Sequence, residues 1–249
     1  MKVSIITPSF NCEKWIEKTY RTIRDQSHSN FEWIVTDDCS TDESYGILKR
    51  LAESDERIIL KRNTVNSGAA VTRNNSISYA SGEFIAFIDS DDLWLPNKLA
   101  KQVSFMTNNS IDFSFTSYEL IDETGVRIGA SVDTHLTEPV SYKDMLRKKA
   151  TLGCSTVMLR RSKFDDLSMP LIRTGQDYAL WLKLLKTGTR AHAYSDVLTQ
   201  YRIVPNSISR NKFKKAKRQW EIYRKIERLS LLESVECFVF YAYRAVFRK

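Results

Sequence analysis

The sequence predicts an α/β protein with a mostly parallel, doubly wound sheet flanked by helices and followed by a basic helical tail. Short β-type apolar runs alternate with amphipathic helical patterns through roughly the first ninety residues, and this alternation is typical of βαβ units. With 249 residues and 42% hydrophobic content, the chain can bury a sizeable core. Its excess positive charge is confined to the carboxyl-terminal segment, which sets that segment apart.

The first half carries the clearest pattern. Strands are expected over residues 3–7, 31–35, 58–60 and 84–88, and helices over 13–24, 43–52 and 68–80. Ile16, Tyr20 and Ile23 share one face of the first helix, as in an amphipathic helix packed on a core. Gly68 opens the third helix, and Gly82 follows its end.

The second half is less regular. A helix is expected over 97–106, strands over 113–118 and 155–159, and an amphipathic helix over 176–186, whereas residues 125–152 give no clear pattern. The sequence contains no internal repeat and no low-complexity linker. Residues 1–209 are therefore expected to form one domain, with 210–249 as a tail.

Cysteine, histidine and apolar patterns exclude several classes of protein. Cys12, Cys39, Cys154 and Cys237 form no CxxC pair, and the three histidines are dispersed, so neither a zinc site nor a disulfide framework is expected. The first apolar run stops at Pro8, too early for a signal peptide. No stretch approaches the ~20 apolar residues of a spanning helix. A cytoplasmic protein is expected.

A cluster of carboxylates follows the strand expected over 84–88. Asp89, Ser90, Asp91 and Asp92 come directly after this apolar run, which places oxygen ligands at the carboxyl edge of the sheet. Mg²⁺ and Mn²⁺ prefer oxygen ligands and often share them with substrate phosphates. The cluster predicts a metal and diphosphate site, although acidic tetrapeptides are also common in exposed loops.

Polar residues follow the other expected strands as well. Thr7 to Asn11 come after the first strand, Asp37 and Asp38 after the second, and Arg73 lies on the helix opened by Gly68. The carboxyl ends of parallel strands meet at one edge, where open α/β sheets bind ligands. These positions are therefore expected to converge with Asp89–Asp92 on a nucleotide site.

The order and spacing of these motifs identify a family resemblance. They are Thr7-Pro8-Ser9-Phe10-Asn11, Asp37-Asp38-Cys39-Ser40-Thr41-Asp42, Asn66-Ser67-Gly68 with Arg73-Asn74, Gly82-Glu83-Phe84, and Asp89-Ser90-Asp91-Asp92. Two later motifs are Gly175-Gln176-Asp177-Tyr178-Ala179-Leu180-Trp181, and Tyr201-Arg202 with Pro205-Asn206-Ser207-Ile208-Ser209. Together they resemble the family-2 glycosyltransferases, whose GT-A fold is a Rossmann-like sheet. The resemblance covers residues 3–209 and implies a nucleotide-sugar half (1–105) and an acceptor half (106–209).

The resemblance implies a role for each residue of the donor site. Pro8 and Phe10, with Thr7 beside them, would line the base pocket, and Asp38 would accept a hydrogen bond from uracil N3, which cytosine cannot offer. Arg73 would approach the diphosphate. Asp91, with Asp89 or Asp92, would bind Mg²⁺ or Mn²⁺, and Asp89 and the adjoining Ser90 would also belong to the donor-binding residues. The implied donor is a UDP-sugar.

Asp177 is the catalytic base that the resemblance implies, acting on the acceptor hydroxyl. It lies at the start of the helix expected over 176–186, where the helix dipole favours an ionised carboxylate. One base and no covalent intermediate imply an inverting transfer. The sequence lacks the QxxRW signature and the spanning helices of processive polysaccharide synthases, which implies transfer of a single hexose. The sequence departs from the family at Gln176, where a glutamate is usual, and at Val204, where many relatives have a histidine.

Other interpretations remain open for the same residues. Asp177 also suits a helix N-cap, and a lone arginine such as Arg73 is usually a surface residue. A non-catalytic carbohydrate- or nucleotide-binding protein would not need the carboxylate cluster and Asp177 together. A sugar nucleotidyltransferase is expected to carry a glycine- and lysine-rich loop after the first strand, where this chain has Pro8 to Asn11.

The tail is the second functional segment. Residues 210–249 contain 12 Lys/Arg and four Glu, a net charge of +8 that equals the charge of the whole chain. A basic helix over 211–228 and the aromatic run after Glu236 suit the inner face of a bacterial membrane. The alternative is a helix packed on the domain with a solvated basic face. Nucleic-acid binding has no motif to support it.

The family resemblance also implies an acceptor. Bacterial members of this size commonly add one hexose to an undecaprenyl-diphosphate sugar during synthesis of O-antigen, capsule or exopolysaccharide. A peripheral position on the membrane would bring the site to such a lipid-linked substrate. The sequence does not distinguish among glucose, galactose and N-acetyl sugars as the transferred hexose.

Overall fold

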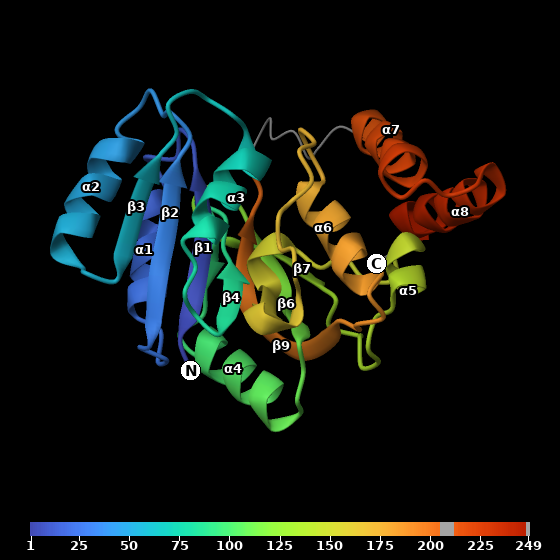
Figure 1. Cartoon of the computed structure of the whole chain (residues 1–249), viewed down its shortest axis with the longest axis horizontal. Helices are drawn as coiled ribbons and strands as arrows, with labels where there is room; N and C mark the ends of the chain where they lie inside the picture. The colour runs from blue at the N-terminus through green and yellow to red at the C-terminus, as the bar shows by residue number, and fades with distance from the viewer. Residues whose placement is uncertain (205–211, 248–249) are drawn as a thin grey trace.

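The computed structural model describes residues 1–204 and 212–247. The strands of the described chain are β1 (Val3–Ser9), β2 (Phe31–Asp37), β3 (Ile58–Arg62), β4 (Phe84–Phe87), β5 (Leu93–Trp94), β6 (Phe113–Ile121), β7 (Arg127–Val132), β8 (Val157–Arg160) and β9 (His192–Arg202). The α-helices are α1 (Ile16–Arg24), α2 (Ser44–Ser54), α3 (Ala69–Ser78), α4 (Lys98–Asn108), α5 (Tyr142–Leu146), α6 (Gln176–Leu185), α7 (Lys212–Glu221) and α8 (Leu231–Phe247). These elements confirm the predicted α/β architecture (Figure 1).

The strands form one sheet in the order β3-β2-β1-β4-β8-β6-β9-β5, with β7 paired to β6. The first four strands are parallel, as predicted. The second half is mixed, because β8 runs antiparallel to both of its neighbours, β4 and β6. The chain moves from β1 outward through β2 to β3 and then returns to place β4 on the other side of β1. That reversal of strand order is where open α/β sheets bind ligands.

Alternate residues of the strands bury two separate cores, one on each face of the sheet. Ile6 of β1 and Phe87 of β4 belong to one core, with α6 and part of the tail. Ile5 and Phe84 belong to the other, with α1, α2 and α4. Side chains of a strand alternate between faces, so a sheet covered on both sides reads as a continuous apolar run. This burial fixes where each strand ends.

A close approach of two turns locks the amino edge of the sheet. A Cβ on Gly82 would lie 2.7 Å from the Ser4 nitrogen, so only glycine fits here. The buried Glu32 carboxylate accepts hydrogen bonds from Ser4 Oγ at 2.5 Å and from the Ser81 amide at 2.7 Å. Burial alone would raise the pKa of Glu32, but these bonds and Lys2 lower it to about 2. The sheet between β1 and β4 is therefore firmly held.

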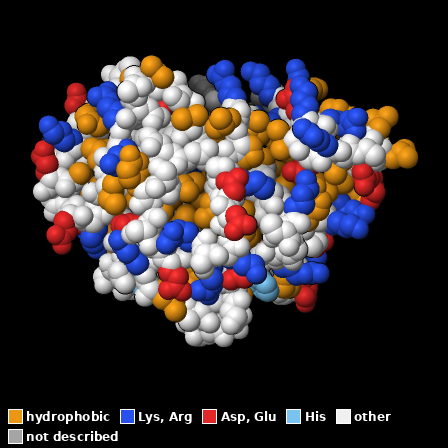
Figure 2. Space-filling view, in the orientation of Figure 1, with side chains coloured by type: hydrophobic (Ala, Val, Ile, Leu, Met, Phe, Trp, Pro, Cys, Tyr) orange, Lys and Arg blue, Asp and Glu red, His pale blue; other side chains and the backbone are white. Residues whose placement is uncertain are grey.

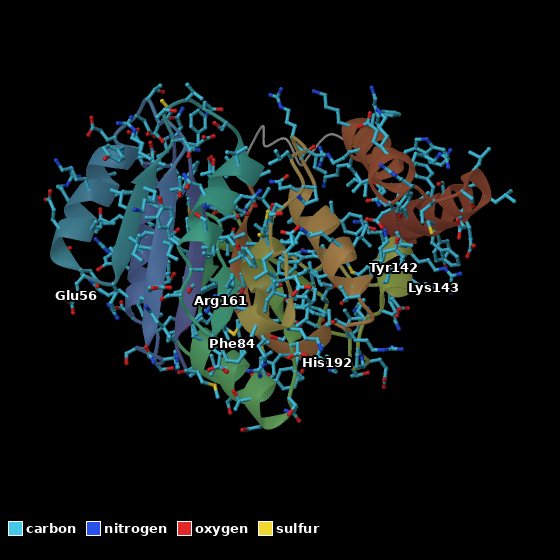
Figure 3. The ribbon with its side chains drawn as sticks, viewed as in Figure 1. Glu56, Phe84, Tyr142, Lys143, Arg161 and His192 are labelled. Carbon is cyan, nitrogen blue, oxygen red and sulfur yellow. The ribbon has the colours of Figure 1, made fainter. Side chains whose placement is uncertain are left out.

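The tail packs on the domain with its inner surface. Tyr223 is fully buried, and Cys237 is 6% exposed; both belong to the core that contains α6. Tyr142, on α5 beside the tail in Figure 3, donates a hydrogen bond to Glu227, whose carboxylate lies 2.6 Å from Lys186 Nζ. The single basic helix expected over 211–228 is divided into α7 and a π-helical turn, η4 (Ile222–Ile226).

Within residues 1–204 and 212–247, no helix has both the length and the apolar character needed to span a membrane. The expected closing motif Pro205-Asn206-Ser207-Ile208-Ser209 lies outside the described residues.

Candidate active site

An open cleft of about 1050 Å³ lies at the carboxyl edge of the parallel strands. One side, which we call the sheet wall, is lined by Pro8, Phe10, Asp38, Arg73, Asp89, Ser90 and Asp91. The other side, which we call the helix wall, is lined by residues 171–177, before and at the start of α6, and by Arg218 of α7. Residues that are far apart in the sequence thus line one cavity, and all but two of the predicted site residues are among them.

The part of the sheet wall expected to hold a base is built around Asp38. Its carboxylate accepts hydrogen bonds from the amides of Ser67 and Gly68, both at 2.8 Å, and from Asn63 Nδ2 at 2.7 Å. Gly68 has a φ of +83°, which glycine adopts without strain. A carboxylate has about four acceptor sites, so Asp38 retains capacity for a ligand. Phe10 is 48% exposed at the rim, where an aromatic ring can stack on a base.

Arg73 lies at the centre of the sheet wall. It forms an ion pair with Asp89, and the residue is only 5% exposed. Its Nε and Nη1 are buried without a hydrogen-bond partner among the described residues. Buried donors are normally satisfied, and a planar guanidinium matches phosphate oxygens. The arginine is therefore a buried cation prepared for an anion, which the surface role considered for it does not explain.

Asp91 and Asp89 are the carboxylates of the cleft that suit a metal. Burial, followed by the nearby charge of Asp89, raises the pKa of Asp91 to about 6. Asp91 and Asp89 lie close enough for their negative charges to repel each other, and a divalent cation with oxygen ligands would relieve that repulsion. No group of three or more potential ligands occurs in the described part of the chain. Two carboxylates would leave coordination positions for a substrate's phosphate oxygens, so the residues fit a shared Mg²⁺ or Mn²⁺.

Asp92 and Thr7 lie outside this lining, contrary to their predicted places. Asp92 is 1% exposed and accepts hydrogen bonds from Ser155 Oγ at 2.5 Å and from the Arg202 amide at 2.8 Å. Because Asp92 does not line the cleft and each of its oxygens accepts a hydrogen bond inside the protein, its position is structural rather than metal-binding. Thr7 is fully buried, and its hydroxyl accepts a hydrogen bond from Trp33 Nε1 at 2.9 Å.

Three residues that sequence reasoning did not assign to the site hold the loop of Asp89–Asp92. Ser155 Oγ accepts a hydrogen bond from the Asp89 amide at 3.0 Å. Thr19 donates to the carbonyl of Ser90 at 3.0 Å, and Arg202 Nε donates to the carbonyl of Asp91 at 2.7 Å. Only Arg202 belonged to a recognised motif. Ser155 and Thr19 carry no local signal, because their role arises from contacts between distant segments.

Asp177 stands on the helix wall, one residue into α6. The N-cap position belongs to Gly175, which has a φ of +76°, so the N-cap role considered for Asp177 does not apply. One Asp177 oxygen accepts a hydrogen bond from the Tyr178 amide at 2.8 Å. The half-buried carboxylate lines the same cleft as Asp91. Its position suits a base that acts on a ligand bound between the two walls.

Arg218 completes the helix wall from the tail. A Cβ on Gly175 would lie 3.0 Å from Arg218 Cδ and 3.2 Å from Ile222 Cδ1, so the absence of that atom lets α7 approach closely. Burial lowers the pKa of Arg218, and the charge of Asp177 opposes that effect. From the sequence, Arg218 belonged to a basic helix directed at solvent or a membrane.

Comparison with known proteins establishes the family. Residues 4–168 match the model of glycosyl transferase family 2. The chain belongs to this family. The family that the sequence motifs predicted is thereby confirmed.

Relatives and a solved structure agree with this family-2 assignment. TuaG of Bacillus subtilis (strain 168), named for teichuronic acid biosynthesis, is 46% identical over 98% of this chain and 96% of its own. WfgD of Escherichia coli, named as a UDP-Glc:α-D-GlcNAc-diphosphoundecaprenol β-1,3-glucosyltransferase, is 40% identical over 88% of this chain and 84% of its own. Residues 1–349 of TarS from S. aureus, solved with UDP, superpose with a TM-score of 0.74 at 22% identity, covering 98% of this chain and 71% of that one. The two relatives confirm the predicted bacterial surface-polysaccharide type, and the solved structure confirms the predicted GT-A fold.

Proposed function

We propose that this family-2 glycosyltransferase moves one hexose from a UDP-sugar to a lipid-linked sugar acceptor, with inversion and with the help of Mg²⁺ or Mn²⁺. The observation that carries the proposal is the cleft itself, which places Arg73, Asp89 and Asp91 on one wall and Asp177 on the other. The first wall suits a nucleotide diphosphate with its cation, and the carboxylate of the second wall suits the hydroxyl group of an acceptor. WfgD, a relative named for transfer from UDP-Glc to a GlcNAc-diphosphoundecaprenol acceptor, supports both substrates.

The sheet wall would hold the donor. Phe10 would stack on uracil, Asp38 would accept the hydrogen bond from N3, and the unsatisfied donors of Arg73 would bind the diphosphate. A cation held by Asp91 and Asp89 would stabilise the negative charge that develops on the departing UDP. Because that charge is stabilised, the leaving group would need no protein acid to protonate it.

The helix wall would supply the base. The acceptor oxygen would attack the anomeric carbon as the bond from that carbon to UDP breaks, and the hydroxyl proton would pass to Asp177. A single displacement inverts the anomeric centre, so an α-linked UDP-sugar would give a β-linked product. An α-linked product would contradict this mechanism. A non-catalytic binding protein would need neither Asp177 nor the alignment of the two walls.

A peripheral position on the inner face of the cell membrane would suit the lipid-linked acceptor. The outer face of α8 exposes a stripe at helical spacing, which we call the α8 stripe: Leu231, Leu232, Val235, Val239 and Tyr243 are 47–83% exposed. An exposed apolar face beside basic residues is typical of helices that bind an anionic membrane surface. The inner face of α8 packs on the domain, so both of the roles predicted for the tail are compatible.

The donor site is tested by titrating the purified protein with UDP by calorimetry. Binding is expected with Mn²⁺, and it should be strongly weakened by EDTA and by Asp91→Ala. Asp165→Ala, which removes an exposed carboxylate away from the cleft, is the matched control and should bind UDP as the unmodified protein does. Absence of UDP binding under every condition would favour the non-catalytic interpretation.

A further inference from the structure

A second depression adjoins the candidate active site. It lies between residues 172–174 and the outer surface of α7 and η4, with a volume of about 680 Å³. Its charged lining consists of Arg173, Lys214, Lys217, Arg218, Glu221 and Lys225, and we call it the basic groove. Residues 214, 217, 218, 221 and 225 recur every three or four positions, so they share one side of the helical segment. Figure 2 shows blue side chains gathered over α7.

The lining of the basic groove is strongly positive. Five of its side chains are Lys or Arg, and its acidic member, Glu221, lies 3.9 Å from Lys225. Arg173, Lys217 and Lys225 are exposed to solvent. Like charges brought together in a concave surface repel one another, and a multivalent anion relieves that repulsion. Arginine adds planar, two-pronged recognition of phosphate oxygens.

The groove and the cleft are continuous. Residues 172–174 and Arg218 line both of them. The Nε of Arg218 is buried and has no hydrogen-bond partner among the described residues, so this donor is available at the junction. A ligand that occupied the groove could therefore extend past Arg218 and reach Asp177.

Exposed apolar side chains belong to the segments that form the groove and the cleft. Leu171, which lines the cleft, is 73% exposed in the loop before α6, and Phe213, four residues before Lys217 on α7, is 89% exposed. Ile226, which is 36% exposed, lines the groove itself. Cationic and apolar groups side by side suit a ligand that carries both an anion and a hydrocarbon chain.

We propose that the basic groove binds the diphosphate of the lipid-linked acceptor, with the acceptor sugar at Asp177 and the start of the hydrocarbon chain on Leu171, Phe213 or Ile226. The proposal rests on the proposed function, because it names the part of the acceptor that this region of the site recognises. A sugar diphosphate lipid presents its sugar, its anion and its chain in that order. The cleft at Asp177, the basic groove beyond Arg218 and the apolar side chains beside the groove offer complementary surfaces in the same order.

The probe is farnesyl diphosphate, titrated below its micellar concentration in the presence of EDTA and without UDP. The variant combines Arg173→Gln, Lys217→Gln and Lys225→Gln. The affinity of this variant for farnesyl diphosphate should fall on the order of 100-fold, since each cation facing an anion contributes roughly fivefold.

Two controls separate the anion from the chain and from general charge. Farnesol, which has no diphosphate, should bind the unmodified protein and the variant with the same affinity. Lys18→Gln, Lys49→Gln and Arg50→Gln remove the same charge from exposed positions outside the groove and should leave the affinity unchanged.

Several results would overturn the proposal. The groove variant could bind farnesyl diphosphate normally, or the control variant could lose as much affinity, which would indicate general electrostatic attraction. A groove variant that loses binding to phosphatidylglycerol vesicles but keeps farnesyl diphosphate would identify lipid headgroups as the occupant instead. UDP binding with Mn²⁺ should be unchanged in a variant that carries only Lys217→Gln and Lys225→Gln, because neither of these residues lines the cleft. If the unmodified protein does not bind UDP, the proposed function fails. The titration with farnesyl diphosphate contains neither UDP nor metal, so its result is independent of that outcome.

Discussion

The sheet wall and the helix wall enclose one cleft, but they are assembled differently. The sheet wall comes from the ends of β1, β2 and β4 and the start of α3, all within the first 91 residues. The helix wall joins the loop before α6 to Arg218, which belongs to the tail. Strand ends of a parallel sheet are placed by the sheet itself, whereas the helix wall depends on helices that pack from distant parts of the chain. The sequence therefore predicts which side chains lie at strand ends, but it does not predict which side chains helix packing brings to the cleft.

The difference also suggests a division of labour. The sheet wall carries the unsatisfied donors of Arg73, which suit a diphosphate, and the carboxylates of Asp89 and Asp91, which suit a cation bound with it. The helix wall carries Asp177 and leads into the basic groove, which suits the acceptor. If this is correct, changes on the sheet wall should weaken UDP binding, and changes on the helix wall should weaken transfer alone.

The largest separation between the walls is expected for Asp177→Asn. Turnover should fall by about 10²–10⁴-fold, because a positioned base contributes that much to proton removal. The affinity for UDP with Mn²⁺ should stay unchanged, because the role proposed for Asp177 concerns the acceptor alone. Transfer rates and calorimetry measure the two quantities. Asp165→Asn serves as the control, and a joint loss of transfer and UDP affinity would mean that the walls do not act separately.

Arg73→Gln tests the sheet wall from the other direction. The affinity for UDP should fall between about 10- and 100-fold, since a hydrogen bond to a charged group contributes roughly 1.5–3 kcal/mol. Binding of uridine, which has no diphosphate, should change little. Thermal unfolding must first show that the variant folds, because Arg73 is buried. Equal losses for uridine and UDP would place Arg73 away from the phosphates.

Membrane binding is expected to involve the α8 stripe, on the tail that also supplies Arg218 to the helix wall. The double variant Leu232→Glu and Val239→Glu places negative charge in the α8 stripe. Its binding to anionic vesicles should fall by about tenfold or more, because these two apolar side chains can no longer be buried in the membrane. UDP affinity should be unaffected. Val126→Glu, at a residue 62% exposed on the domain, is the control. Unchanged vesicle binding by the double variant would remove α8 from the membrane contact.

The smallest effect is expected for Gly175→Ala, which disturbs the junction of the helix wall and the tail. A positive φ costs a non-glycine residue about 1 kcal/mol, and the new methyl would press on Arg218. Gly188→Ala has a comparable φ of +93° with no atom within 4 Å. Both variants should lose similar stability in thermal unfolding. Only Gly175→Ala should lose transfer, by a few fold, and equal transfer in the two would show that the Arg218 contact has no catalytic consequence.

The sequence predicted the parallel half of the fold and most of the sheet wall for a physical reason. Continuous apolar runs locate buried strands, and the polar residues after them must lie at the carboxyl edge. The mixed half was harder, because β7 and α5 lie within residues 125–152, where neither period dominates. Helix and strand limits differed from the predicted ones by a few residues, as is usual where the ends depend on packing.

Adjacent residues of one motif could not be separated by sequence alone. Asp91 lines the cleft, whereas its neighbour Asp92 is occupied by Ser155 and Arg202. Both are aspartates in one turn, so only the positions of the distant partners distinguish them. The same limit applies to Arg218, which lies on a basic helix in the sequence but packs on Gly175 in the fold.

The contribution of Arg218 has a consequence for how the enzyme is made. During synthesis the sheet wall emerges from the ribosome early, with its strands complete well before the tail. The cleft acquires its full lining only when the segment that contains Arg218 has emerged and docked on α5 and α6. The order of translation would therefore complete the nucleotide side of the cleft, whose Asp89–Asp92 loop needs Ser155 and Arg202, before the acceptor side, which also needs Arg218.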